Sequence, residues 1–590
     1  MTKTRLAAAL SLALLVAPVS QAAKYRVIEL PVADKGRSSF PSAINQDGNI
    51  TVIVGAPATQ TTRFSTLYNI PIDLDLLDFE SEVLINGLTD VQSASNGDFN
   101  IIDYELLLAL IRSADGTQSA QQIADNISFL ASENEINYIP GFDQLTDQGN
   151  EFSLASNTIV RDINDSGMMI GGGEGFYNKV DYTFNTGEDS TFVVQEFGTR
   201  GFVSIGGNTF DLPAPETIAG GFSAAYGINE SNQVVGYGTT LFLSDTLETA
   251  VTDCENEELV DDGDPDTVDF PLRGDIPVES CISSLVSSLS TPAFTAGFAQ
   301  LRGLIWQLDD QGNLLDTKEL GLVFEPEADD TKIYSSQALA INDNGIAVGI
   351  SNGQYTESDV TVIRNYGVIF DDDEVINLTP DPDPTVARTS NTISRAQDIN
   401  NNNLVVGHQF KFINGRNRSK FFVYDMNLSE LTFPEDFFLG SSSIALDINN
   451  NGLVVGYGDI DAALVDRRTE GFLYNHETKE FNGIHSLISC DSSYTIVQAN
   501  SINDNNEIAA TALYKGPSRD AKGQVILDST GSEVIVDLVT AVKLVPIVGG
   551  EIENCDAPDE INKERQGASV TWILGLSLLL LGWRRFKTVC

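Results

Sequence analysis

The stretch Ile448-Asn449-Asn450-Asn451-Gly452-Leu453-Val454-Val455-Gly456 decides the fold. The residues just before Ile448-Asn449 have the composition of a short β-strand. Asparagine and glycine then supply turn chemistry, because an asparagine side chain bonds back to the backbone and glycine accepts a positive φ. Val-Val-Gly resumes as a β-branched strand. The stretch therefore predicts a β-hairpin.

The same phrase, roughly A-x-x-I-N-x-x-G-x-V-V-G, occurs seven times along the chain. Its turn asparagines are Asn45, Asn164, Asn229, Asn342, Asn400, Asn449 and Asn503. Each phrase is followed by an aromatic strand that often opens with glycine, as in Gly471-Phe472-Leu473-Tyr474, and then by a short strand such as Val375-Ile376-Asn377-Leu378. One unit therefore holds about four short strands.

The spacing of the units indicates the architecture. The last four turn asparagines are 58, 49 and 54 residues apart, which is the size of a propeller blade. The segments lack the 3.6-residue apolar period of helical repeats. Seven units without capping repeats predict an all-β, seven-bladed β-propeller over residues 24–555, with an open β-solenoid as the alternative. We expect the strand at residues 25–30 to close the ring beside residues 534–538 and so remove the free sheet edges.

Two longer spacings, of 119 and 113 residues, indicate insertions at about 72–150 and 240–300. The first is expected to follow the aromatic strand that contains Leu67-Tyr68. Residues 103–112 have helical spacing within it, and residues 120–130 are a candidate second helix. In the last unit, Val525-Ile526-Leu527 is the expected aromatic strand.

The N-terminal 23 residues predict a secretory signal peptide. Lys3 and Arg5 precede a short apolar run, and Ser20-Gln21-Ala22 fits the small-x-small cleavage rule.

The C-terminal segment, residues 567–590, is apolar and ends with the cations Arg584, Arg585 and Lys587. Cations in this position stay on the cytoplasmic side, and the apolar run is short for a permanent span. We expect export and sorting machinery to bring this segment at least transiently into the inner membrane, with residues 556–566 as a linker. The segment resembles a GlyGly-type C-terminal sorting tail, which implies processing near Gly567-Ala568-Ser569; a simple C-terminal anchor is the alternative.

The cysteines agree with an oxidising compartment. Cys590 lies beyond the terminal apolar segment, which leaves an even number in the body. Of the three possible pairings we expect the local one, Cys254 with Cys281 and Cys490 with Cys555.

The charge excludes some classes of partner. The chain has 84 acids against 34 bases and a net charge of −50. It has no basic face for binding nucleic acid, and it should not dock on an anionic membrane surface.

No residue is assigned a catalytic, cofactor or metal role. The only histidines are His408, His476 and His485, and no G-x-S-x-G motif accompanies them. Turns such as Asn342-Asp343-Asn344-Gly345 lack the full EF-hand pattern, so at most weak Ca²⁺ binding is expected. The tripeptide Arg273-Gly274-Asp275 is interpreted as a chance occurrence of an adhesion motif.

The phrase Ile-Asn-x-x-Gly-x-Val-Val-Gly, followed by Gly-Phe-x-Tyr, resembles the HAF-type extracellular repeat of bacteria. The terminal segment resembles the GlyGly-type sorting tail of Gram-negative bacteria, although Gly567-Ala568-Ser569 has one glycine where that motif has two. The whole chain is similar to an uncharacterised family of exported Gram-negative proteins. The resemblance implies a cell-surface or extracellular location and carries no activity.

We therefore expect an exported, non-catalytic binding protein for an unknown ligand, either a glycan or a protein. The alternatives are a secreted polysaccharide lyase or glycosidase on a propeller scaffold, and a passive envelope component. A cluster of tyrosine, arginine and paired acids at one mouth would favour the enzyme. A blocked mouth with exposed insertions would favour binding.

Overall fold

The computed structural model describes the chain from residue 24 to residue 552, with short gaps. The described ranges are 24–55, 66–114, 117–146, 149–242, 245–258, 271–289, 299–327, 330–357, 360–372, 374–378, 393–462 and 467–552. The signal peptide at 1–23, the linker at 556–566 and the terminal segment at 567–590 lie outside these ranges. No helix within them is long and apolar enough to cross a membrane.

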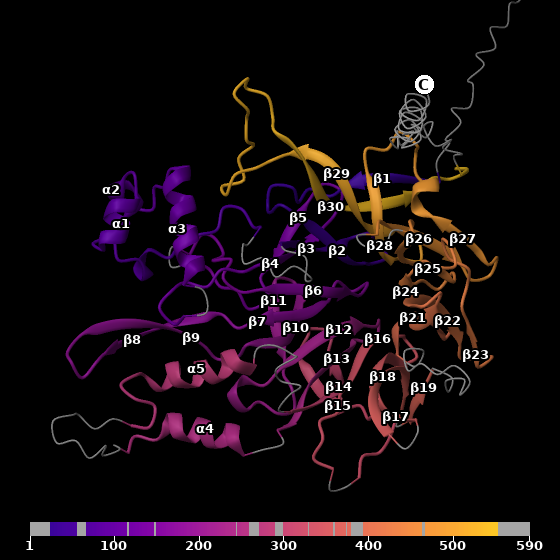
Figure 1. Ribbon diagram of the computed structural model, residues 1–590, viewed down its shortest axis with the longest axis horizontal. Helices are drawn as coiled ribbons and strands as arrows, with labels where there is room; N and C mark the ends of the chain where they lie inside the picture. Colours follow the sequence, from indigo (N-terminus) through magenta and orange to yellow (C-terminus); the bar gives the residue numbers. More distant parts are fainter. Residues whose placement is uncertain are drawn as a thin grey trace, which may run out of the picture.

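Seven four-stranded antiparallel sheets surround a common axis, as predicted for a seven-bladed propeller (Figure 1). From the axis outward, the first four blades are β2 (Ser39–Ile44), β3 (Ile50–Gly55), β4 (Asn126–Ala131) and β5 (Ile136–Ile139); β6 (Thr158–Ile163), β7 (Met169–Glu174), β10 (Thr199–Ile205) and β11 (Asn208–Leu212); β12 (Ser223–Ile228), β13 (Gln233–Phe242), β14 (Ala299–Leu308) and β15 (Leu314–Glu319); and β16 (Ser336–Ile341), β17 (Ala347–Glu357), β18 (Val360–Asp371) and β19 (Glu374–Asn377).

The last three blades follow the same order. They are β20 (Ser394–Ile399), β21 (Leu404–Ile413), β22 (Arg416–Asp425) and β23 (Glu430–Thr432); β24 (Ser443–Ile448), β25 (Leu453–Asp459), β26 (Thr469–Asn475) and β27 (Glu480–Gly483); and β28 (Thr495–Ile502), β29 (Ile508–Pro517), β30 (Ile535–Pro546) and β1 (Tyr25–Glu29).

The first strand of the chain closes the ring. β1 is the outermost strand of blade 7 and pairs antiparallel with β30, Tyr25 lying opposite Pro546 and Glu29 opposite Val542. The prediction of closure is confirmed, but its register is wrong. Residues 535–538 pair with β29, and the partner of β1 is the later half of the long strand β30.

The glycine that opens the aromatic strands allows neighbouring blades to approach closely. A Cβ atom on Gly471 in β26 would lie 2.9 Å from the backbone nitrogen of Ala499, which is on the innermost strand of the next blade. Gly367 has the same relation to Ala396. The small residues at these positions thus set the spacing between blades.

Every innermost strand contains a β-bulge just before its Ile-Asn pair. In β24, for example, Ala445 pairs with Gly456 and Asp447 pairs with Val455, so Leu446 has no direct partner. The glycine of Val-Val-Gly fits this bulge, because a side chain on Gly456 would overlap the carbonyl oxygen of Ile444. A bulge redirects side chains. Here it occurs at the two variable positions of the A-x-x-I-N phrase.

Two of the predicted boundaries are wrong. Residues 126–131 form β4, the third strand of blade 1, and not a helix, so the first insertion lies between β3 and β4 and does not follow the aromatic strand. Residues 525–527 belong to the connection between β29 and β30, and β30 is the third strand of blade 7. In both blades a long connection precedes the third strand, and this strand lacks the opening glycine by which the sequence identifies the others.

Three insertions form one lobe beside the ring (Figure 1). The first contains η1 (Leu74–Leu76), α1 (Glu82–Gly87), α2 (Val91–Ala94) and the predicted helix, α3 (Ile101–Ser113). The second, a hairpin of β8 (Tyr177–Thr183) and β9 (Asp189–Gln195), was not predicted. The third contains α4 (Thr246–Glu255) and α5 (Val278–Leu289). Each insertion connects the second and third strands of its blade, so all three leave the same face of the ring.

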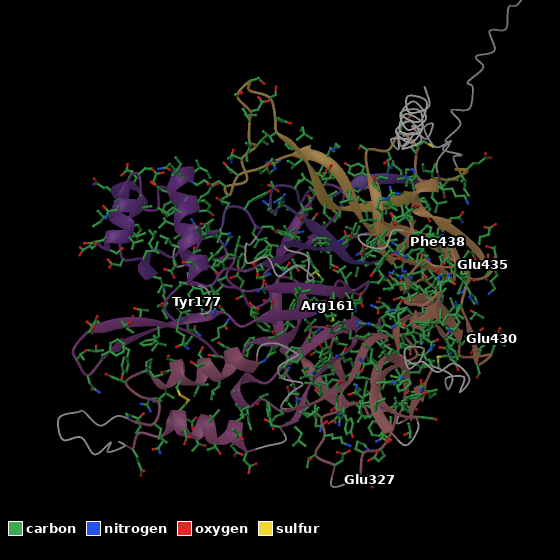
Figure 2. The ribbon with its side chains drawn as sticks, in the orientation of Figure 1. Arg161, Tyr177, Glu327, Glu430, Glu435 and Phe438 are labelled. Carbon is green, nitrogen blue, oxygen red and sulfur yellow. A yellow bond between two sulfur atoms is a disulfide. The ribbon has the colours of Figure 1, made fainter. Side chains whose placement is uncertain are left out.

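Hydrogen bonds join the three insertions. The hydroxyl of Tyr177, labelled in Figure 2, donates to Asp73 at 3.0 Å. The side-chain amide of Gln118 donates to the carbonyl oxygen of Ser280 at 2.8 Å, and the backbone nitrogen of Gln195 donates to the hydroxyl of Ser283 at 2.9 Å. These bonds make the lobe a single packed unit.

Candidate functional site

The seven turn asparagines do what the sequence predicts and also join neighbouring blades. Each side-chain oxygen accepts the backbone N–H four residues later, which closes the turn. At six of the seven blade junctions the side-chain amide also donates to the backbone carbonyl of the asparagine in the next blade, at 2.9–3.4 Å. The asparagines are almost fully buried. They form a ring of hydrogen bonds around the axis.

A second ring of hydrogen bonds joins the turns at all seven blade junctions. The residues that follow these asparagines are Gln46, Asp165, Glu230, Asp343, Asn401, Asn450 and Asp504. Each backbone N–H donates to the side-chain oxygen of the equivalent residue in the next blade, at 2.7–3.1 Å, and the last returns to the first. This arrangement explains the acids of the turns without a metal ion. Within the described ranges, no group of three or more His, Cys, Asp or Glu residues could hold one.

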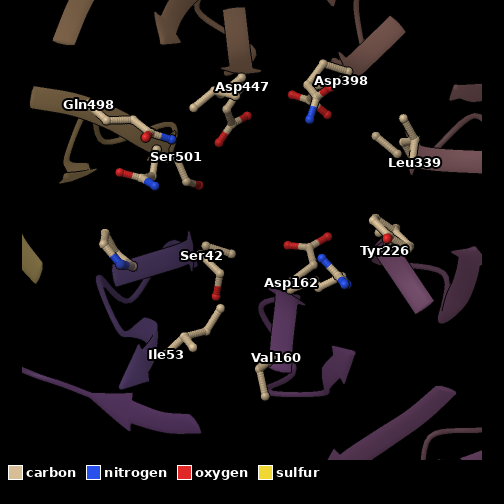
Figure 3. Close-up of a pocket in the computed structure, with 18 of the residues that line it drawn as sticks. Ser42, Ile53, Val160, Asp162, Tyr226, Leu339, Asp398, Asp447, Gln498 and Ser501 are labelled. Atoms are coloured by element: carbon tan, nitrogen blue, oxygen red, sulfur yellow. The ribbon is translucent and has the colours of Figure 1, made fainter. Parts of the chain in front are cut away.

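A cavity of about 310 Å³ lies on the axis, lined by residues from all seven innermost strands (Figure 3). The two bulge positions supply most of its wall. They are Ser42 and Ala43, Arg161 and Asp162, Tyr226 and Gly227, Leu339 and Ala340, Gln397 and Asp398, Leu446 and Asp447, and Asn500 and Ser501. No two blades carry the same pair of residues at these positions, although the phrase around them repeats. The lining of the cavity therefore does not follow the sevenfold repeat of the blades.

Three carboxyl groups project into this cavity from different blades (Figure 3). Each is held by a backbone N–H of the following blade: Asp162 accepts from Ile228 at 2.9 Å, Asp398 from Ile448 at 2.9 Å and Asp447 from Ile502 at 2.8 Å. The aspartates keep some surface toward the cavity, while protein surrounds them on all other sides.

Burial changes the protonation of two of these groups. It raises the pKa of Asp162 to about 7. It also raises the pKa of Asp398 well above its usual range, and the charge of Asp447, to which Asp398 is hydrogen-bonded, raises that pKa further. Two carboxyl groups in direct contact cannot both be ionised cheaply, so Asp398 keeps its proton to higher pH than an ordinary carboxyl group.

Two arginines occupy the other part of the cavity. Arg161, labelled near the centre of the ring in Figure 2, lies over the ring of Tyr226 at 4.1 Å. Arg395 donates from Nε to Gln397 at 2.7 Å. Burial lowers the pKa of Arg395, and Arg161 is a cationic neighbour that lowers it further. Burial and then the charge of Arg395 lower the pKa of His408 to about 4, so this histidine is neutral at pH 7.

The sequence does not single out these cavity residues. The available signal was the variability of the two x positions in A-x-x-I-N, together with the repeated Asp before Ile in three copies. Recognising it requires the bulge, which turns both positions toward the axis.

The other predicted residues lie away from the cavity. Cys254 and Cys281 form a disulfide bond that ties α4 to α5. Cys490 is disulfide-bonded, and its expected partner Cys555 lies outside the described residues, as do Gly567, Ala568 and Ser569. His485 is exposed, and burial lowers the pKa of His476.

The Arg-Gly-Asp tripeptide has an internal role. Arg273 donates to the carbonyl oxygens of Cys254 and Asn256, and Asp275 accepts from the hydroxyl of Tyr182 at 2.8 Å. Both charged side chains are thus used to anchor the insertion.

A second hollow, of about 230 Å³, lies at the seam between blades 7 and 1. Its lining includes Arg37, Tyr68, Tyr514 and Arg519. It is smaller than the axial cavity and is lined from only two blades.

A model of a family of proteins of unknown function, DUF3466, matches residues 4–586. The chain belongs to this family. No curated protein matches the DUF3466 chain. Among solved structures, the β-propeller domain of the trilobed protease from Pyrococcus furiosus is 7% identical with a TM-score of 0.33, and the match covers 85% of this chain and 97% of that one.

A second solved structure similar to the DUF3466 chain is the acylaminoacyl peptidase of Pyrococcus horikoshii. It is 10% identical with a TM-score of 0.27, and the match covers 67% of this chain and 49% of the peptidase. Scores this low carry no argument about activity, so the function of the DUF3466 propeller has to be argued from its own side chains.

Proposed function

We propose that this protein is an exported, non-catalytic binding protein and that its ligand is a small polar molecule held in the axial cavity. The observation that carries the proposal is the lining of that cavity. The turn asparagine is the same in all seven blades, yet the two bulge positions place a different pair of residues toward the axis in each blade. Concave sites with a few convergent polar groups are the usual form of small-molecule sites.

Export to the cell surface or the medium is part of the same proposal. It is supported by the signal-peptide pattern of residues 1–23, by the Cys254–Cys281 disulfide and by the resemblance to HAF-type repeats. A disulfide persists in an oxidising compartment, which agrees with export.

A secreted polysaccharide-active enzyme is the second candidate, because the cavity does combine tyrosine, arginine and paired acids. The geometry of the acids argues against a glycosidase. In a glycosidase the two catalytic carboxyl groups are about 5–9.5 Å apart, on either side of the bond to be cut. Asp398 and Asp447 are instead hydrogen-bonded to each other. Asp162 has the pKa nearest to that of an effective general base, so a lyase activity would be traced to this residue.

The test incubates the full chain, purified from an oxidising compartment, with a panel of mono- and oligosaccharides and amino acids. Binding is measured by isothermal titration calorimetry and released sugar ends by a reducing-end assay. We expect saturable binding without release. Ser42→Trp, which places an indole in the cavity, should abolish binding, and Ser113→Trp on the exposed surface of α3 should not.

Three results would overturn the proposal. Released sugar ends that disappear in Asp162→Asn would establish the enzyme. Binding that survives Ser42→Trp would move the site to the insertions, and no binding to any probe would leave a structural envelope role.

A further inference from the structure

We infer that the ligand of the axial cavity is a sugar acid, a molecule with one carboxylate on a hydroxyl-bearing carbon frame. The inference rests on the proposed function and adds the chemical class of the ligand. It starts from the juxtaposition of Arg161 and Arg395, which reach the cavity from blades 2 and 5.

Neither arginine forms a direct ion pair with a described residue, although three carboxyl groups line the same cavity. Within the described ranges, neither guanidinium group lies within 4.0 Å of a carboxylate oxygen, although acids outnumber bases 84 to 34. Other largely buried cations do pair with acids: Lys420 is 2.7 Å from Asp436, and Arg467 is 2.6 Å from Asp459. Two adjacent cations without an ion pair, in so acidic a chain, are a site for an anion that comes from outside.

The protein holds both guanidinium groups in place but uses only some of their hydrogen-bond donors. The ring of Tyr226 supports the plane of Arg161, whose buried Nε has no hydrogen-bond acceptor. The side-chain oxygen of Gln397 accepts a hydrogen bond from Nε of Arg395. The terminal nitrogens of Arg395 donate to no acceptor in the described part of the chain. A guanidinium group carries five N–H donors in a planar fork that matches a carboxylate with two parallel bonds. Both forks are therefore fixed in place with donors to spare.

The rest of the cavity suits hydroxyl groups. Gln498 has no hydrogen-bond partner among the described residues, and Asn500 uses only its oxygen, which accepts from Thr511 at 2.9 Å. The carboxyl oxygens of Asp398 and Asp447 provide further hydrogen-bond acceptors. Hydroxyl groups satisfy such a wall, because each can also donate and accept.

The charge of the cavity favours a single negative charge on the ligand. The two arginines share the cavity with three carboxyl groups, so a dianionic phosphate ester would lie close to carboxyl oxygens as well as to guanidinium groups. A carboxylate adds one charge only. The volume of about 310 Å³ is at the low end for ligand pockets, which fits one sugar unit better than a chain of several.

The experiment compares matched pairs that differ only in the carboxylate. The full chain is titrated at pH 7 with D-galacturonate against D-galactose and with D-glucuronate against D-glucose, and Kd is measured by calorimetry. We expect at least one uronate to bind at least about tenfold more tightly than its neutral partner, which is the range of a charge-assisted bidentate contact.

Substitutions then locate the preference. Arg161→Gln and Arg395→Gln should each reduce uronate affinity about tenfold or more without lowering the melting temperature of the unliganded protein, because each removes one of two like charges. Arg161→Lys keeps the charge but not the fork and should also lose affinity. Arg416→Gln, at the exposed first residue of β22, is the matched control and should bind as the parent does.

The outcomes separate the inference from the proposed function. If a neutral sugar binds as tightly as its uronate, or if uronate binding survives both arginine substitutions, the cavity binds ligands but the sugar-acid inference is wrong. If inorganic phosphate binds more tightly than either uronate, the ligand class is also wrong. If no probe of the wider panel binds, the proposed function falls as well.

Discussion

The ring of turn asparagines can be tested at one blade junction with Asn449→Asp. The replacement has the same shape and keeps the oxygen that accepts from the backbone nitrogen of Leu453 at 3.0 Å. It removes the amide nitrogen, which donates at 2.9 Å both to the carbonyl oxygen of Asn503 and to the side-chain oxygen of Asn506. Only the contacts to the next blade are lost, and the turn itself is preserved.

The expected loss of stability follows from these contacts. Two buried hydrogen bonds contribute about 1 kcal/mol each. The carbonyl oxygen of Asn503 keeps its bond from the backbone nitrogen of Asn506, but the new carboxylate oxygen faces it where an N–H donor stood, which costs about 1–2 kcal/mol more. Asn449 is only 4% exposed, so water does not replace the lost donor. We expect the free energy of unfolding to fall by about 3–4 kcal/mol at pH 7.

The measurement is urea unfolding followed by the fluorescence of the buried Trp306 and by circular dichroism. Asn45→Asp is the matched control, because Asn45 is equally buried and makes the same turn bond to Asn49, at 3.0 Å, but its amide has no acceptor in the described ranges. This control should lose about 1 kcal/mol or less. Equal losses in the two variants would refute the idea that the amides hold blades together.

Three further predictions concern the cavity, the lobe and the spacing of the blades. Because the pKa of Asp398 is raised in the folded state, the native protein binds a proton that the unfolded chain releases, so stability should fall as pH rises from about 4 toward neutrality. Asp398→Asn replaces that proton with a permanent N–H toward Asp447 and should flatten the melting temperature between pH 4 and 8. Replacing Cys254 and Cys281 with serine opens a 27-residue loop. In the chain-entropy model the lost disulfide stabilises the folded insertion by about 3.5 kcal/mol. The replacement should therefore expose α4 and α5 to proteolysis while the ring keeps its unfolding midpoint. Gly471→Ala should lower the free energy of unfolding by about 2 kcal/mol or more, measured in urea, since its Cβ would lie 2.9 Å from the backbone nitrogen of the next blade.

Controls for these predictions come from the same chain. Gly440→Ala places its Cβ 3.4 Å from the nearest side-chain atom and should be close to neutral. A pH profile that stays steep in Asp398→Asn would assign the dependence to another group, of which Asp162 is the first candidate. Cooperative loss of the whole ring on cutting the disulfide would contradict the view of the lobe as a separate packed unit.

The propeller could be predicted because the turn chemistry is local. Asn449 closes its own turn with a bond to Leu453, four residues away, so the phrase carries its structural meaning wherever it occurs. The closing strand was also predictable, because a hairpin partner was missing at the start of the chain. Its register was not, since β30 is 12 residues long and pairs with β29 over its early part as well.

The cavity and the rings depend on distant contacts and could not be predicted. Asp162 and Ile228 meet only because the blades are arranged around an axis, and no local pattern records that meeting. The strand Asn126–Ala131 was mistaken for a helix because a long insertion separates it from β3. Its neighbours in the sheet, not its own residues, determine its conformation.

The position of β1 has a consequence for how the chain becomes a ring. This strand is the first part of the body to be synthesised, and its partner β30 is the last, so the two ends of blade 7 meet only after all the other blades exist. A chain that stops early leaves β29 with an open edge and β1 without a partner, and such edges attract other chains. Synthesis of β30 is thus the step that allows the seven sheets to close into a ring. A product that ends before β30 leaves sheet edges exposed, which proteases and chaperones can detect.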